Sequence, residues 1–381
     1  MTDTATDGPA PPATEPDEPV LKLEVVDVVH ETGEACSIVL RPPRPVSYTS
    51  GQFLTVAVPS TTTGTVARCY SLSSAPHETD LLKVTVKRTA DGYASNWLCD
   101  HIRPGDVITS LPPSGIFTPK DFDHDFLLFA GGSGITPVIS IAKSALATGT
   151  GRVVLVYANR DADSVIFADE LRALAEQHPD RFVVIHWLEV LQGLPTPEHM
   201  RAIAAHHSTY DAFVCGPGPF MKGVVSALKE LGFPRERRHQ EKFVSLGGNP
   251  FGEHADDISA EISAAEGLSG PDADTDEIGN ASAEVKRDSP AAVTGDLDGE
   301  EFAFDGWDPD KPLLDFLLEQ GVQAPYSCRE GHCSACACVV LEGEVSMRTN
   351  DVLDDDDLAD GIRLACQALP VSDTVKITYS G

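Results

Sequence analysis

Five cysteines near the C-terminus carry the strongest chemical signal in the chain. Cys328, Cys333 and Cys336 lie within SCREGHCSACAC and Cys366 follows in LACQALP, which gives the spacing C-x4-C-x2-C-x29-C. A tight loop of three thiolates with one distant thiolate is the donor set of a [2Fe–2S] cluster, in which each iron takes two. A structural zinc site more often has paired C-x2-C knuckles. We therefore predict that these four cysteines bind the cluster, and that Cys338, which breaks the spacing, is a packed thiol.

A second group of residues ends the run TVARCYSL. Arg68, Tyr70 and Ser71 resemble the flavin signature of the ferredoxin–NADP⁺ reductase superfamily. The resemblance implies that the arginine holds the flavin diphosphate, the tyrosine packs on the isoalloxazine and the serine hydrogen-bonds near N5, as a catalytic residue. Each role suits the chemistry of its side chain: a bidentate cation for phosphate, an aromatic face for a ring and a small hydroxyl beside the reacting atom.

A third group follows the run LLKVTVKR. Gly92 and Ser95 in GYAS resemble the superfamily's second diphosphate contact, where N–H groups at a helix start meet phosphate. We also assign Val86 and Lys87 to this flavin site. Lys87 and the next residue, Arg88, could equally be solvated charges at a strand end.

Two turns could hold a nicotinamide nucleotide. The first follows the apolar run FLLFA and opens a predicted helix, so its backbone amides can approach a diphosphate; its predicted contacts are Gly131, Gly132, Ser133, Gly134 and Thr136. Such a turn is also common as pure packing. The second turn, CGPGPFM, contributes Cys215, Gly216 and Pro217. In the superfamily the matching turn lies beside the nicotinamide, which makes Cys215 a candidate catalytic residue rather than an ordinary buried thiol.

The segment EKF closes this part of the chain. In the superfamily the matching segment positions an acid and an aromatic ring over the flavin, which makes Glu241 a candidate catalytic residue and Phe243 a candidate flavin contact. Phe243 could instead be a core anchor.

The elements that must position these residues change along the chain. Between residues 21 and 111, short runs rich in β-branched residues alternate with turn signals, which is typical of a small antiparallel β-barrel. From residue 126, apolar runs alternate with helical stretches, which indicates a doubly wound α/β domain with a parallel sheet. The predicted regions are a disordered tail 1–19, a barrel domain 20–122, a nucleotide domain 123–243, an acidic linker 244–292 and a cluster domain 293–381.

Charge and hydropathy exclude several classes of protein. The chain of 381 residues has 28 Lys and Arg against 59 Asp and Glu, a net charge of −31, so its field opposes binding to a nucleic acid backbone. The N-terminus lacks the basic start and apolar core of a signal peptide, and no run is long enough to span a membrane. We therefore expect a cytoplasmic protein with neither nucleic acid nor membrane partners.

Acidic residues gather toward the C-terminus. Those from Val293 onward include the run from Asp354 to Asp357. We expect this run to be a solvated face; the alternative is a surface that steers a basic patch of a redox partner.

The order of the three motif sets extends the resemblance over nearly the whole chain. This order is that of a ferredoxin–NADP⁺ reductase with a C-terminal plant-type ferredoxin. Within that superfamily the chain resembles the reductase components of actinobacterial 3-ketosteroid 9-alpha-hydroxylases, through the segments TVARCYSL, VKRTADGYASNWLCD, FVCGPGPFM and SCREGHCSACAC. The resemblance implies an antiparallel β-barrel FAD domain, an α/β nucleotide domain and an α+β β-grasp ferredoxin domain. It also implies that NADH supplies electrons through FAD and one [2Fe–2S] cluster to a terminal oxygenase of Rieske type.

Two questions stay open at this level. The first is the partner, because similar reductases serve other mono- or dioxygenases or epoxidases. The chain could also be a ferredoxin-type electron carrier whose front half is not catalytic, but the flavin and nicotinamide motifs argue against this alternative. We expect NADH over NADPH, but Arg160 could bind a 2′-phosphate that Asp161 would repel.

Overall fold

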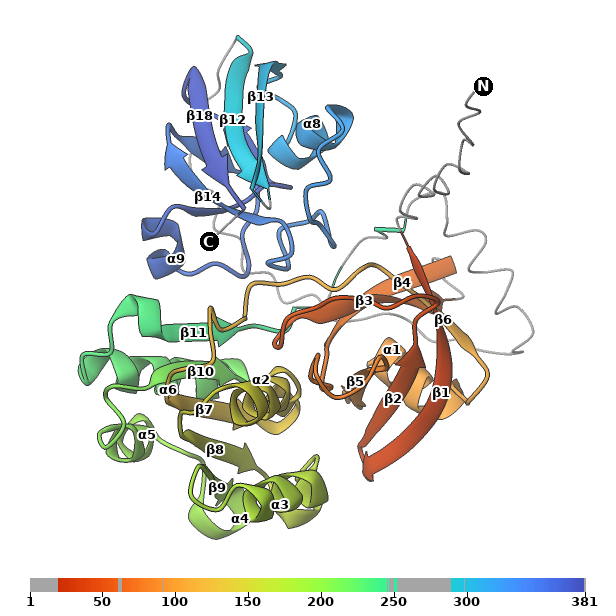
Figure 1. Ribbon diagram of the computed structural model, residues 1–381, viewed down its shortest axis with the longest axis vertical. Helices are drawn as coiled ribbons and strands as arrows, with labels where there is room; N and C mark the ends of the chain where they lie inside the picture. The colour runs from red at the N-terminus through yellow and green to blue at the C-terminus, as the bar shows by residue number, and fades with distance from the viewer. Residues whose placement is uncertain are drawn as a thin grey trace, which may run out of the picture.

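The computed structural model describes residues 20–60, 64–90, 92–244, 246, 250–251, 289–297 and 299–379. The predicted tail and most of the predicted linker lie outside these residues. Within them the chain forms a barrel, a parallel sheet flanked by helices and a smaller mixed sheet, in that order (Figure 1). No helix in these ranges is long and apolar enough to cross a bilayer.

The first unit is an antiparallel barrel. Its elements are β1 (Leu21–Thr32), β2 (Ala35–Arg41), β3 (Phe53–Ser60), β4 (Gly64–Ser71), β5 (Leu82–Lys87), α1 (Tyr93–His101) and β6 (Val107–Ser110). In the described residues the strand order is β4-β3-β6-β1-β2-β5, and an antiparallel bridge between Leu72 and Val84 joins the two edges. Helix α1 packs Trp97 and Leu98 into the barrel core. The ends of β4 and β5 and the start of α1 therefore carry the predicted flavin residues.

The second unit is doubly wound. Its strands are β7 (Phe126–Gly131), β8 (Val153–Asn159), β9 (Phe182–Leu188), β10 (Asp211–Cys215) and β11 (Arg238–Glu241). Its helices are α2 (Ile135–Thr148), α3 (Ala168–Gln177), α4 (Glu189–Gln192), α5 (Pro197–Ala204) and α6 (Gly218–Glu230), with 3₁₀ turns at Gly132–Gly134, Ala162–Ser164 and Arg235–Arg237. The described strands pair in parallel in the order β11-β10-β7-β8-β9. Helices α2 and α3 belong to one apolar core and α5 and α6 to another. Because β7 and β10 are neighbours, their two following turns lie side by side.

The third unit is an α+β domain. Its elements are β12 (Ala291–Leu297), β13 (Glu300–Trp307), α8 (Leu313–Glu319), β14 (Ala337–Glu342), β15 (Val345–Met347), α9 (Asp355–Ala359), β16 (Ile362–Leu364), β17 (Ala368–Pro370) and β18 (Thr374–Thr378). Its main sheet has the order β13-β12-β18-β14-β16 in the described residues, with β12 and β18 parallel. Helix α8 buries one leucine-rich face in the core. The three predicted fold classes are confirmed.

The barrel and the parallel sheet are packed directly together. Ser50 and Ser144 hydrogen-bond at 2.6 Å, and the ammonium of Lys143 lies 2.8 Å from Glu78 and 2.9 Å from Glu170. Lys143 is 4% exposed, and a buried cation is tolerated because two carboxylates pair with it. The flavin and nucleotide halves therefore have a fixed relative position.

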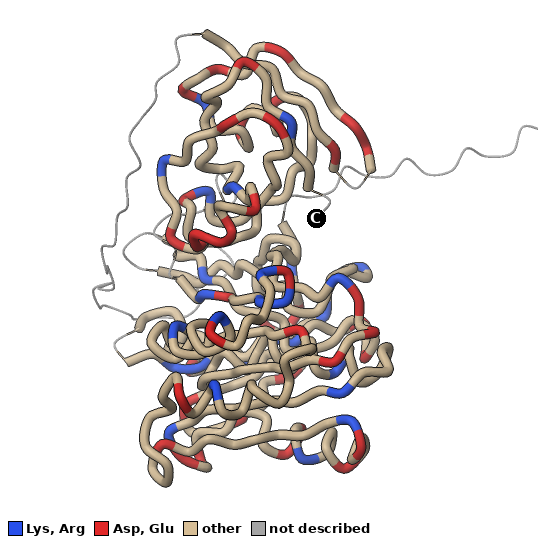
Figure 2. Tube along the Cα trace, turned by 90° about the vertical axis from the view of Figure 1, so that its left-hand side faces the viewer, with Lys and Arg blue, Asp and Glu red and all other residues tan. Residues whose placement is uncertain are grey.

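The acidic run does not form a solvated face. Asp356 pairs with Lys229 at 2.9 Å and with Arg238 at 3.2 Å, and Asp357 pairs with Arg235. Figure 2 shows acidic segments of the upper domain next to basic segments of the unit below it. The expectation of solvation is wrong for Asp356 and Asp357, because three bases of the nucleotide domain lie opposite these carboxylates, whereas Asp355 is exposed.

Candidate functional site

The four predicted cluster ligands come together at one point. The thiol of Cys333 donates to the sulfur of Cys328 at 3.1 Å, and hydrogen bonds from Cys333 and Cys366 lower the pKa of Cys328. Cys366 also contacts the sulfur of Cys336. The ligand set is assembled from the loop before β14 and the turn after β16, two segments that strand pairing brings together.

The surroundings of these thiols fit a cluster. The N–H of Glu330 donates to the Cys328 sulfur at 3.4 Å, as expected where backbone amides stabilise anionic sulfur. Gly331 has φ +82°, and a Cβ there would lie 2.7 Å from the carbonyl oxygen of Thr349, so the loop can close only around glycine. Cys338 is buried in the domain core on β14, and its burial raises the pKa of its thiol.

The predicted flavin residues of β4 lie at the open end of the barrel. Arg68 is half-buried, and its guanidinium donates to the carbonyl oxygens of Ala67 at 2.8 Å and Leu246 at 3.2 Å. Tyr70 packs at the edge of the barrel core. Ser71 is buried and pairs with Phe53 in the sheet. The strand thus places a cation, an aromatic ring and a hydroxyl in sequence along one edge.

The second flavin segment is the start of α1. Gly92 is its N-cap, and among the described residues no side chain caps this helix, a kind of helix start that suits an anion. The hydroxyl of Ser95 accepts from the N–H of Thr89 at 3.1 Å, which holds the turn. Val86 is fully buried in the barrel core, so its predicted contact with the flavin would be made by its backbone.

The glycines of the nucleotide turns have two different functions. A Cβ on Gly134 would lie 2.2 Å from the carbonyl oxygen of Cys215, and one on Gly131 would lie 2.8 Å from Pro217. These glycines let the two turns pack on each other, as does Gly216, whose Cβ would lie 2.9 Å from the N of Gly131. Gly132, with φ +52°, faces the ammonium of Lys87 instead.

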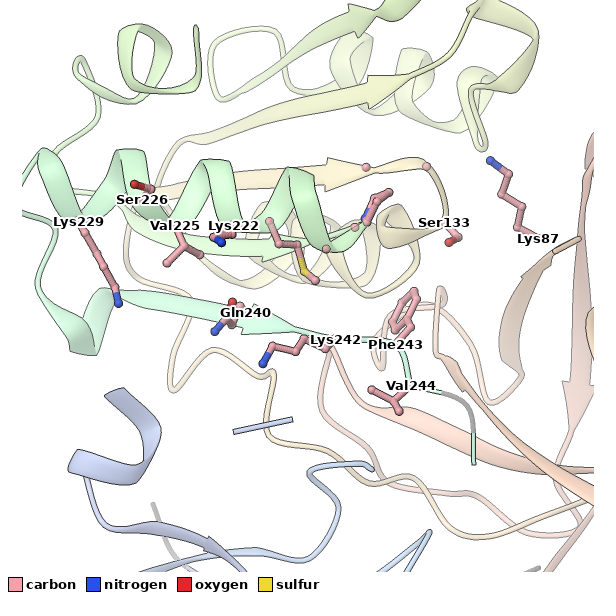
Figure 3. Close-up of a pocket in the computed structure, with 16 residues that line it drawn as sticks. Lys87, Ser133, Lys222, Val225, Ser226, Lys229, Gln240, Lys242, Phe243 and Val244 are labelled. Carbon is pink, nitrogen blue, oxygen red and sulfur yellow. The ribbon is translucent and has the colours of Figure 1, made fainter. Parts of the chain in front are cut away.

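The two turns form one wall of a cleft of about 930 Å³. Gly131, Gly132, Ser133, Gly216 and Pro217 line it, together with Lys87 from the barrel (Figure 3). The other two predicted contacts of the first turn lie behind the wall: Gly134 and Thr136 are buried, and the Thr136 hydroxyl donates to the carbonyl oxygen of Ser133 at 3.1 Å.

Phe243 lies in the same cleft. Its side chain is 50% exposed and lines the cavity beside Lys242 and Val244 (Figure 3). A core anchor would be buried, so that alternative is wrong. An exposed aromatic ring between the barrel and the nucleotide turns is suited to cover a planar ligand.

Two candidate catalytic groups lie on neighbouring strands. Cys215 of β10 pairs with Glu241 of β11 in the parallel sheet. Burial raises the pKa of Glu241 to about 8 and raises that of Cys215 well above its usual value. Burial therefore favours the neutral form of both groups.

The cluster loop packs on the flavin strand. The hydroxyls of Ser327, next to the ligand Cys328, and Thr55 of β3 hydrogen-bond at 2.5 Å. Cys69, between the flavin residues Arg68 and Tyr70, also contacts Ser327. The predicted flavin and cluster sites are therefore separated by little more than one strand.

Several residues of the cleft were missed from the sequence. Lys222, Ser226 and Lys229 of α6 line it along one helix face, together with Gln240 of β11. The spacing of the α6 residues, at i, i+4 and i+7 after the second glycine turn, is a signal that could have identified them.

The residues at this junction fit the predicted FAD, nicotinamide nucleotide and [2Fe–2S] cluster. Three helices, α1, α2 and α6, start at this junction without a side-chain cap, and each start suits a phosphate. Lys87 of the barrel lines the same cleft as the nucleotide turns, and the cluster loop contacts the barrel at Thr55 and Cys69. The fold and site define an oxidoreductase that couples a nicotinamide nucleotide, a flavin and a [2Fe–2S] cluster.

Comparison with known families supports this class. Residues 23–118 match the oxidoreductase FAD-binding domain, residues 128–226 the oxidoreductase NAD-binding domain and residues 296–371 the 2Fe-2S iron-sulfur cluster binding domain. Phthalate dioxygenase reductase has a similar fold, with a TM-score of 0.54 at 23% identity, over 94% of this chain and 98% of that one. The predicted cofactors, FAD and a [2Fe–2S] cluster, are confirmed at the level of the domains.

Curated relatives narrow the class to a family. The chain is 53% identical over 361 residues to the 3-ketosteroid-9-alpha-monooxygenase, ferredoxin reductase component, of Rhodococcus rhodochrous, covering 94% of this chain and 96% of the relative. It is 51% identical over 374 residues to the protein of the same description from Mycolicibacterium smegmatis, covering 95% and 99%. The chain belongs to this family of ferredoxin reductase components, and the predicted resemblance is confirmed.

Proposed function

We propose that this protein oxidises NADH and delivers the electrons one at a time to the Rieske-type terminal oxygenase of a 3-ketosteroid 9-alpha-hydroxylase. The observation that carries this proposal is the contact of the cluster loop with the barrel, where Ser327 meets Thr55 of β3 and Cys69 of the flavin strand β4. Family membership supports the partner and substrate class. An electron carrier with an inactive front half is disfavoured, because its barrel and nucleotide cleft would have no need to meet the cluster loop.

Each part of the chain has a defined task in this reaction. The turns at Gly131 and Gly216 would bind the nucleotide diphosphate, and the exposed ring of Phe243 in the same cleft would cover a planar ring and exclude water. When bound, FAD accepts hydride and the cluster passes on single electrons. The Ser71 hydroxyl and the Glu241 carboxyl would supply hydrogen-bonding groups beside the reacting atoms. The apolar surroundings of Cys215 keep this region dry.

The pairing of Arg160 favours NADH over NADPH. Its Nε lies 3.0 Å from a carboxylate oxygen of Asp161, and its Nη2 lies 3.6 Å from Glu34. Asp161 is itself fixed, because it accepts from the N–H of Ser164 at 2.9 Å. A 2′-phosphate at the end of β8 would meet two carboxylates around one arginine and be repelled.

Asp161→Asn is expected to raise kcat/KM for NADPH about tenfold, because one lost repulsion of about 1.4 kcal/mol is tenfold in an equilibrium. Asparagine can still accept from Ser164, so NADH use should change less than about twofold. Steady-state ferricyanide reduction with each nucleotide measures both. Asp163→Asn, in the same turn, is the control. An unchanged NADPH to NADH ratio in Asp161→Asn would disprove this role.

Reconstitution tests the proposed partner. The reductase, the Rieske oxygenase of a 3-ketosteroid hydroxylase, NADH and a 3-ketosteroid are combined, and 9α-hydroxylated product is measured. We expect one product per NADH consumed, and none when the reductase is omitted. If the reductase supported product formation by an unrelated oxygenase but not by this one, the protein would belong to a different oxygenase system.

A further inference from the structure

The cluster loop is covered in this arrangement of the domains. The four ligands are between 1% and 7% exposed. The loop shares one apolar cluster with the barrel and with the segment after β11, made by Phe53, Ala57, Ala67, Leu111, Leu246, Phe251, Cys328, Cys333 and Ala335. The side of the loop that faces the flavin strand is therefore closed to any other protein.

A second set of contacts holds the same arrangement through charge. Asp356 meets Lys229 and Arg238 of the nucleotide domain, and Asp357 meets Arg235, which also lies 3.5 Å from Asp360. Gln240 of β11 donates to Asp354. Several of these groups are partly exposed; the side chains of Lys229 and Asp356 are 47% and 30% exposed. Water and salt can therefore compete with the ion pairs.

Helix α9, which carries the acidic run, and the cluster loop lie on one face of the iron–sulfur domain. The imidazole Nδ1 of His332 lies 2.6 Å from Asp351, and the N–H of Asp351 donates to the carbonyl oxygen of Gly331 at 3.2 Å. Asp354 then caps α9 by accepting from the N–H of Asp357. A protein that approaches the covered side of the loop would also meet the carboxylates of α9.

We propose that this face serves two partners in turn: the flavin and nucleotide domains while the cluster is being reduced, and the oxygenase after the iron–sulfur domain has undocked. The inference rests on the proposed function. What occupies the face now indicates the chemistry of the second partner: an apolar patch beside clustered lysine and arginine side chains. The contact between α9 and β11 is the releasable part of the interface.

A zero-length cross-link tests this proposal on the native chain. A carbodiimide activates a carboxylate, and the amine of Lys229, 2.9 Å from Asp356, attacks it; an amide forms, and the oxygen leaves as the urea of the reagent. The product is identified by mass spectrometry as a joined peptide lighter by one water. Cytochrome c, a basic one-electron acceptor protein, is the probe: NADH + 2 Fe³⁺ gives NAD⁺ + H⁺ + 2 Fe²⁺.

The cross-linked protein should still reduce its flavin and cluster with NADH, because the docked state is intact. Its reduction of cytochrome c should fall about tenfold or more, since the opening step is blocked. Lys229→Arg keeps the charge but cannot form the amide. It retains the exposed pair of Lys311 and Glu319, 2.6 Å apart, which the reagent can also join. Each protein is compared with its own untreated sample, and treatment should lower cytochrome c reduction by Lys229→Arg only slightly.

Three results would overturn the proposal. One is unchanged reduction of cytochrome c by cross-linked protein. Another is equal loss in treated wild type and Lys229→Arg, which would locate the damage elsewhere. A loss of cluster reduction in the cross-linked protein would also count against it, because it would place the defect before the docked state. Failure of untreated protein to reduce its cluster with NADH would contradict the proposed function instead.

Discussion

Cys328→Ser is expected to abolish NADH-driven reduction of cytochrome c while ferricyanide reduction at the flavin continues. The Cys328 sulfur accepts from Cys333 and Cys366 and so lies at the centre of the ligand set. Loss of a ligating thiolate should reduce partner reduction more than about a hundredfold, because even outer-shell changes at metal sites cost about 10- to 100-fold. Iron content and both reductase activities, measured on one preparation, check the prediction.

Cys338→Ser is the matched control for this variant. Cys338 is as buried as the ligands but belongs to the core on β14. Its replacement should lower the free energy of unfolding by about 1–3 kcal/mol, through the buried hydroxyl, and should leave the iron content unchanged. A Cys338→Ser protein without iron, or a Cys328→Ser protein with full iron and full activity, would contradict the assigned ligand set.

Gly134→Ala should remove most NADH-dependent activity with every acceptor. The added Cβ would lie 2.2 Å from the oxygen and 2.4 Å from the carbonyl carbon of Cys215. Both are backbone atoms of β10, so no side chain can rotate away and the two nucleotide turns must separate. Overpacking of this kind costs about 1–3 kcal/mol or more, and a displacement of about 1 Å at a reacting site can cost about a hundredfold in rate. The thermal midpoint and kcat/KM for NADH measure the two effects.

Gly223→Ala controls for the loss of a glycine in the same domain. Gly223 lies inside α6, and a Cβ there would first meet Pro197 at 3.6 Å, an ordinary contact. Alanine should stabilise the helix by up to about 1 kcal/mol and leave NADH use intact. If Gly134→Ala behaved like this control, close packing of the turns would not be needed for nucleotide binding.

Local spacing carried most of what could be predicted. The four thiols chosen from cysteine spacing lie together, and the alternation of apolar runs and helical segments indicated the parallel sheet. Glycines were harder to interpret. The motif alone does not show that Gly132 faces the cleft while Gly134 meets the backbone of β10, because that depends on how close the two turns approach. Strand alternation already indicated that the side chain of Val86 points inward, which leaves its backbone for the predicted flavin contact.

The contacts between domains could not be predicted. A run of four aspartates has the same composition whether water or a basic surface faces it. Its partner Arg235 is separated from Asp357 by 122 positions, and Ser327 is separated from Thr55 by 272. Sequence patterns report periodicity over a few turns of helix or strand, so they carry no information on such contacts.

An anaerobic titration with NADH tests the central claim most directly. Flavin absorbance and the electron paramagnetic resonance signal of the cluster are followed in the same sample. We predict that NADH bleaches the flavin and produces a reduced [2Fe–2S] signal, while Cys328→Ser shows bleaching without that signal. Bleached flavin with no cluster signal in the wild-type protein, at full iron content, would contradict the path from the nucleotide cleft to the cluster loop.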